Sequence, residues 1–143
     1  MKNKLFCIGL SLVAFLATHL CLNAEPVVVA NKKLSAETIN TDTLKAVFMG
    51  KKVGWDSTST RVVVVLLKEG PTHEAFVQAV AGQSGSQFSS YWRRLFMTGG
   101  GSAPKIFETE AELVKFVAAT DGAIGYTDAA NAGADVLVIP VAK

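Results

Sequence analysis

The pattern of apolar positions changes its period within residues 61–80, and we expect the fold to be organised around this stretch. Its first half is a continuous β-branched and aliphatic run, which is typical of a strand buried on both faces. Its second half carries apolar residues at helical spacing, and Gly70-Pro71-Thr72 separates the two halves. The stretch therefore predicts a central strand, a tight turn and a helix whose first N–H groups point toward a place for a small anion.

The rest of the chain predicts a mixed α/β domain with helices on a mixed sheet. Before the central stretch we expect a strand at residues 27–30 and a helix capped by Asn40 or Thr41. After it we expect a helix from Ser84 or Ser86, a helix capped by Thr109, and strands at 122–126 and 136–141. This order predicts one sheet covered by helices in a single domain.

The helix expected after Ser84 carries large apolar side chains at helical spacing. They are Phe88, Tyr91, Trp92, Leu95 and Phe96. Because such a stripe normally faces the protein interior, we expect these side chains to face the core.

The first 24 residues have the pattern of a secretory signal peptide. Lys2 and Lys4 precede an apolar run, and the small residue Ala24 stands at the expected cleavage point. We therefore predict cleavage after Ala24, a single domain at residues 25–143, and a location in the periplasm.

Two alternatives to this cleavage are an uncleaved anchor and a lipoprotein. The apolar run extended to Leu22 approaches the length that spans a membrane, but His19 interrupts it. A lipoprotein signal at Cys21 would need small residues before the cysteine, where His19 and Leu20 stand.

Composition narrows the chemistry of the predicted domain. Both cysteines, Cys7 and Cys21, lie in the leader, so the domain can form neither a disulfide nor a thiolate metal site. Removing the two leader lysines from the 14 basic residues leaves 12, which equals the 12 acidic residues. This balance does not favour nucleic acid as a partner. Only His73 remains as histidine and no Gly-x-Ser-x-Gly motif occurs, so we expect no catalysis, metal or cofactor.

Several motifs, in their order along the chain, resemble the phosphate-type periplasmic substrate-binding proteins of ABC transporters. These are Val47-Phe48-Met49-Gly50-Lys51, Trp55, the central strand with Phe76 in its helix, and Asp121-Gly122-Ala123-Ile124-Gly125-Tyr126. The resemblance covers nearly all of residues 25–143 and corresponds to one of the family's two lobes. It implies a single lobe of the type II periplasmic-binding-protein fold, and phosphate or a related oxyanion as the ligand. The family position of Trp55 also suggests that it fixes its loop to the domain.

The sequence departs from the family pattern at the ligand site. The family's Ser-Gly-Thr triplet falls on Gly70-Pro71-Thr72 and its arginine falls on Leu66, so of these contacts only the threonine remains. As an anion site, this turn would use Lys68, Gly70 and Thr72. The alternative is a plain helix start with a glycine turn, a proline in the first helical turn and a capping threonine.

A second candidate site is Tyr91-Trp92-Arg93-Arg94. Tryptophan and arginine dominate interface hot spots, so Trp92, Arg93 and Arg94 are candidate partner-binding residues. The alternative is that Trp92 packs inward and the two arginines are solvated.

The remaining polar residues have plain structural interpretations. We expect His73 to lie in an exposed first helical turn, and Glu108, Glu110 and Glu112 to act as acids favourable to a helix N-terminus.

The sequence thus supports two hypotheses for function. The favoured one is a secreted, non-enzymatic binding module with a degenerate phosphate site, which recognises an envelope or transporter protein or forms a homodimer. The alternative is a working receptor that binds phosphate or a related oxyanion at Thr72 and serves an ABC transporter.

Overall fold

A five-stranded mixed sheet lies at the centre of the computed structural model, which describes residues 25–34 and 38–142. Its strand order is β4-β3-β5-β1-β6. The strands are β1 (Pro26–Ala30), β3 (Val63–Leu67), β4 (Lys105–Phe107), β5 (Ala123–Asp128) and β6 (Leu137–Ile139). Strand β3 runs parallel to both β4 and β5, whereas β1 pairs antiparallel with β5 and β6. The predicted leader and its cleavage lie outside the described residues.

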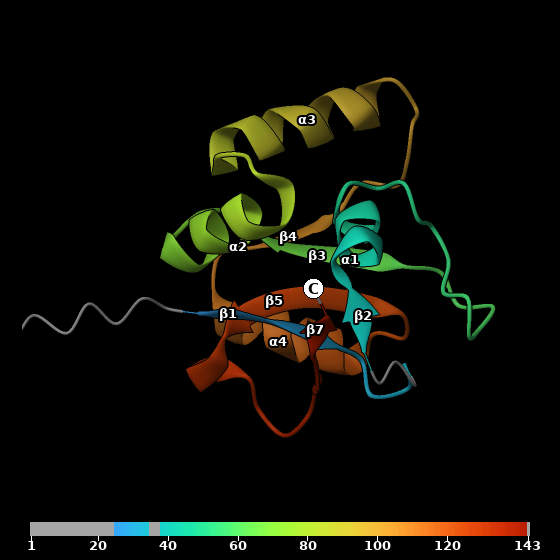
Figure 1. Cartoon of the computed structure of the whole chain (residues 1–143), viewed down its shortest axis with the longest axis vertical. Coiled ribbons are helices and arrows are strands. Elements are labelled where there is room, and N and C mark those ends of the chain that lie inside the picture. Colours follow the sequence, from blue (N-terminus) through green and yellow to red (C-terminus); the bar gives the residue numbers. More distant parts are fainter. Residues whose placement is uncertain (1–24, 35–37, 143) are drawn as a thin grey trace, which may run out of the picture.

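Four α-helices flank this sheet (Figure 1). They are α1 (Thr41–Phe48), α2 (Pro71–Ala81), α3 (Gly85–Met97) and α4 (Glu110–Ala119). Successive residues of a strand face opposite sides of its sheet. In β5, Gly125 lies against Leu113 of α4, whereas Tyr126 stacks on Phe76 of α2, so α2 and α4 cover opposite faces of the sheet. Figure 1 shows α3 as an outer layer beyond α2. The expected mixed sheet flanked by helices is confirmed.

The central strand is buried as predicted. Residues 64–67 of β3 are each at most 9% exposed, and Tyr126 of β5 is fully buried. The ring of Phe76 lies 3.9 Å from that of Tyr126 and 4.8 Å from that of Phe48, measured between centroids. This aromatic group joins α1, α2 and the sheet into one core.

The predicted helix boundaries hold because their capping residues make the expected bonds. Asn40 accepts the Thr43 N–H at 2.7 Å before α1, and Ser84 forms a capping box with Gln87 before α3. Thr109 accepts the Glu112 N–H at 3.3 Å before α4. Local hydrogen bonds therefore determine where these three helices begin.

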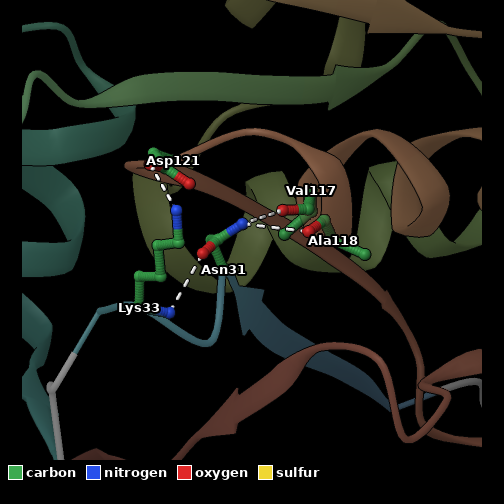
Figure 2. A network of polar contacts seen from close by, with 5 residues as sticks. All are labelled: Asn31, Lys33, Val117, Ala118 and Asp121. Atoms are coloured by element: carbon green, nitrogen blue, oxygen red, sulfur yellow. Dashed lines mark hydrogen bonds and ion pairs between the residues drawn. The ribbon is translucent and has the colours of Figure 1, made fainter.

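Asn31 joins the end of β1 to the end of α4 (Figure 2). Its side-chain amide donates to the carbonyl oxygens of Val117 and Ala118, both at 3.0 Å, and its side-chain oxygen accepts the Lys33 N–H. Asn31 is 4% exposed, so these bonds satisfy a buried polar group and the last carbonyls of a helix together. Lys33 adds an exposed ion pair to Asp121 at 2.9 Å.

Trp55 fixes its loop to the domain, as expected. The indole is 8% exposed and its Nε1–H donates to the Gly122 carbonyl at 3.1 Å. The loop between α1 and β3 is therefore held against the turn that precedes β5.

Three sequence expectations differ from the structure. The segment expected as one strand at 136–141 is divided at Pro140 into β6 and β7 (Val141–Ala142), which belong to different sheets. Two short strands, β2 (Ile39–Asn40) and β4, were not expected. Phe96 is 59% exposed instead of facing the core, because the last turn of α3 lines an open pocket.

Among the described residues, no helix has the length and apolar character needed to cross a membrane.

Candidate binding site

The start of α2 is built by local backbone chemistry. Gly70 has φ of 115° and precedes the helix without a side-chain cap, and Pro71 occupies the first turn, where its missing N–H costs nothing. Thr72 was expected either to cap the helix or to bind an anion. It does not cap α2: its hydroxyl donates to Glu110 Oε1 at 2.6 Å. The interpretation of Thr72 as a capping residue is therefore wrong.

Glu110, the first residue of α4, collects hydrogen bonds at the mouth of α2. Its carboxylate accepts four bonds of 2.6 to 2.9 Å, from Thr72 Oγ1, Thr127 Oγ1, the Asp128 N–H and Asn131 Nδ2. These donors come from α2, the end of β5 and the 3₁₀ turn η1 (Ala129–Asn131). Strands β3 and β5 are parallel neighbours, so this cluster lies at their carboxyl ends, where ligands of open α/β sheets usually bind.

The Glu110 side chain remains ionised at neutral pH. Burial alone would raise its pKa, but hydrogen bonds from Thr72, Asp128, Thr127 and Asn131 outweigh this effect and lower the pKa to about 2. A fixed negative charge thus lies beside the first turn of α2, where the helix dipole stabilises it. A phosphate anion approaching Thr72 would meet this charge and a hydroxyl whose proton is already donated.

The other predicted anion contacts are also engaged or absent. Lys68 Nζ pairs with Glu108 Oε1 at 3.1 Å, and this bond, the charge of Glu108 and that of Glu69 raise the pKa of Lys68. Leu66 is 4% exposed and packs in the core, so no guanidinium replaces the family's arginine there. Of the candidates Lys68, Gly70 and Thr72, two have carboxylate partners and the third contributes only backbone.

His73 is buried, so the expectation of an exposed position is wrong. It is 2% exposed, and its Nδ1 lies 2.5 Å from the Tyr126 hydroxyl. That hydroxyl also accepts the Leu67 N–H at 3.0 Å. Burial lowers the pKa of His73 and raises that of Tyr126. The available sequence signal was spacing: a residue three positions before Phe76 and four before Val77 lies on the apolar face of α2.

The candidate residues of α3 separate into buried and exposed positions. Trp92 is 6% exposed and packs against Phe88, whereas Arg93 and Arg94 are exposed. Neither arginine forms an ion pair with a residue that the structure describes. The described part of the chain contains no group of three or more His, Cys, Asp or Glu residues that could hold a metal ion.

The Glu110 bonds predict a pH-dependent stability. Because the folded pKa of about 2 lies below the ordinary value of 4.5, the unfolded chain takes up the proton first as the pH falls. The stabilisation is therefore fully present above pH 4.5 and is lost as the pH falls toward 2. After a discount for solvent screening of this partly exposed group, we expect a loss of about 1–2 kcal/mol.

Urea unfolding of the wild-type protein and Glu110→Gln across this pH range measures the effect. The two curves should converge in acid, and their difference separates Glu110 from His73, whose pKa is also lowered. Glu112→Gln, in the same turn with an exposed side chain, is the matched control and should follow the wild type. Parallel pH curves for the wild type and Glu110→Gln would contradict the prediction.

The fold is similar to a part of several solved phosphate-binding proteins. The chain aligns with an ABC-type phosphate transport receptor from Vibrio cholerae at 12% identity and TM-score 0.65, covering 81% of this chain and 45% of that one. It aligns with PstS from Borrelia burgdorferi at 14% identity and TM-score 0.55, covering 81% and 46%. It aligns with the phosphate-bound periplasmic protein PfluDING at 21% identity and TM-score 0.63, covering 84% and 37%.

These matches confirm the resemblance at the level of the fold. No family model and no curated protein matches the sequence. The chain spans less than half the length of each of these three receptors. The structural similarity therefore shows the fold alone, and any ligand must be argued from the chain's own residues.

Proposed function

We propose that this chain is a secreted, non-enzymatic binding module of the periplasm, in which the phosphate site is degenerate and a protein of the cell envelope is the partner. One observation carries the proposal: the Thr72 hydroxyl, the last retained phosphate contact, donates to the Glu110 carboxylate at 2.6 Å. The Glu110 carboxylate thus contacts the hydroxyl that an anion at the mouth of α2 would use.

The lost contacts are large enough to abolish useful phosphate affinity. Bonds from charged groups contribute about 1.5–3 kcal/mol each, so loss of the arginine fork and the serine hydroxyl removes roughly 3–6 kcal/mol. This corresponds to about a 10²- to 10⁴-fold weaker complex before repulsion from Glu110 is counted. Because this much phosphate affinity is lost, we propose a role other than phosphate binding.

The same geometry argues against catalysis by His73. The Tyr126 hydroxyl accepts the Leu67 N–H, and no other described residue accepts its proton, so we assign that proton to the bond with His73 Nδ1. The Nε2 atom then carries the proton of the neutral ring and cannot act as a base.

The partner surface that we propose is the α3 face, defined as Arg93, Arg94, Phe96 and Met97. Phe96 and Met97 are 59% and 79% exposed, and the two arginines border them. Exposed aromatic and Met side chains with adjacent guanidinium groups are the residue types enriched in protein interfaces.

Photo-crosslinking in cells tests the partner. A photoreactive phenylalanine analogue at Met97 should give a discrete crosslinked product, and Arg93→Ala with Arg94→Ala should reduce it about tenfold or more. The same analogue at Lys115, an exposed residue of α4, is the matched control and should give none. The α3 face would be refuted as the binding surface if both positions gave equal yields of crosslinked product. It would also be refuted if the yield from Met97 were the same with and without the two arginine substitutions.

A second candidate function is a phosphate receptor that serves an ABC transporter. It is favoured by the fold, since PfluDING was solved with phosphate bound. Binding would then use the first N–H groups of α2 and would require Thr72 to turn away from Glu110.

A further inference from the structure

A second pocket lies between α3 and the β4 edge of the sheet, apart from the Glu110 cluster. Its volume is about 290 Å³, which suits a small molecule. Its apolar walls are Leu66, Leu67, Phe88, Trp92, Phe96 and Ile106. Neither Thr72 nor Glu110 lines it, although Leu66 and Lys68 do, so the pocket adjoins the mouth of α2 without including its threonine.

His73 contributes a buried donor to this pocket. The residue lines the pocket, is 2% exposed, and its Nε2 has no hydrogen-bond partner among the described residues. We assign the ring proton to Nε2, because the Tyr126 hydroxyl accepts the Leu67 N–H and finds an acceptor for its own proton in Nδ1. The wall of the pocket therefore holds a buried N–H group to which no described residue supplies an acceptor, which is costly unless another molecule supplies one.

Trp92 contributes a second buried donor. Its Nε1 also lacks a partner within the described part of the chain, and the residue lines the same pocket. The six-membered ring of the indole faces Gly50, since a Cβ on Gly50 would lie 2.9 Å from Cη2. The five-membered ring, which carries the nitrogen, lies at the other end of the indole. One carboxylate has two oxygens, and each of them can accept one of these two N–H donors.

The charges at the rim have the sign that a carboxylate needs. Lys68 and Arg93 both line the pocket, and Arg93 forms no ion pair with any described residue. A phosphate dianion would lose far more hydration than two donors in an apolar pocket restore, whereas an apolar tail gains from the same walls.

We propose that this pocket binds a small carboxylic acid with an apolar tail. The carboxylate accepts the N–H groups of His73 and Trp92, Arg93 lies at the entrance, and the tail packs against Phe88 and Phe96. This proposal goes beyond the proposed partner, although the pocket shares Arg93 and Phe96 with the α3 face.

The test is an NMR titration of the ¹⁵N-labelled protein with hexanoate. The chain has two tryptophans, so the spectrum contains two indole N–H signals. The Trp92 signal should shift and saturate, while that of Trp55, bonded to Gly122, should stay in place. Acetate lacks the tail and hexanol lacks the charge, so each should bind at least about tenfold more weakly than hexanoate.

Two neighbouring residues of α3 provide matched variants. Phe96→Ala should weaken hexanoate binding about tenfold, because Phe96 lines the pocket. Met97→Ala should leave it unchanged, because Met97 is 79% exposed and lies outside the pocket. A Trp92 signal that does not saturate, or equal effects of both variants, would overturn the proposal. Tighter binding of a short peptide ending in a free leucine carboxylate would overturn the assignment to a small acid.

Discussion

Replacing Gly122 with alanine should lower the free energy of unfolding by about 3 kcal/mol or more. Gly122 has φ of 77°, and a Cβ there would lie 2.1 Å from the Arg61 carbonyl oxygen and 2.8 Å from Thr60 Cγ2. The backbone cannot shift freely, because the Gly122 carbonyl accepts both the Val63 N–H and the Trp55 Nε1–H. Alanine would therefore strain the turn that leads into β5.

Urea unfolding followed by circular dichroism measures this loss. Gly133→Ala is the matched control, since a Cβ at Gly133 meets nothing within 4 Å and its φ is not positive. It should change stability by less than about 0.5 kcal/mol. Similar midpoints for the Gly122→Ala and Gly133→Ala proteins would show that the turn tolerates a side chain.

Replacing Phe76 with alanine should cost about 3–5 kcal/mol of stability. The ring is 3% exposed, lies 10° from parallel to Tyr126 and meets Phe48 edge-on. Its removal leaves a cavity between α2 and the sheet and withdraws the support of Tyr126, to which His73 is bonded.

Phe96→Ala is the control for this prediction. Both phenylalanines have apolar spacing on a helix, but Phe96 is 59% exposed. Its removal should change the free energy of unfolding by less than about 0.5 kcal/mol in the same urea experiment. Equal losses for the two variants would mean that the core is not organised around Phe76 and Tyr126.

Most of the fold could be predicted because its signals are local. The aliphatic run of β3 and the capping residues Asn40, Ser84 and Thr109 act within a few positions of their own elements. Strands of two or three residues, such as β2 and β4, carry no periodicity that separates them from loops. They form because β7 and β3 provide pairing partners distant in sequence.

The orientation of individual side chains was harder to predict, because it depends on neighbouring layers. Phe96 continues the apolar stripe of α3 but lines the pocket beside β4. His73 is polar, yet the Tyr126 hydroxyl, 53 positions away, makes its burial acceptable.

The candidate site could be predicted only in part for the same reason. Comparison of motifs identified Thr72 as the one retained ligand contact, and the sequence placed Glu110 at a helix start. The bond between them joins residues 38 positions apart and depends on how α2 and α4 meet at the carboxyl ends of β3 and β5. No local pattern contains that information.

The central claim is that Glu110 occupies the mouth of α2 and leaves no working phosphate site. Calorimetric titration of the purified protein with phosphate at low salt tests it most directly. We expect no saturable heat at millimolar phosphate, because the Thr72 hydroxyl already donates its proton to Glu110 and the Glu110 carboxylate repels the incoming anion. Saturable binding that Thr72→Val abolishes would contradict the claim and establish the chain as a phosphate receptor.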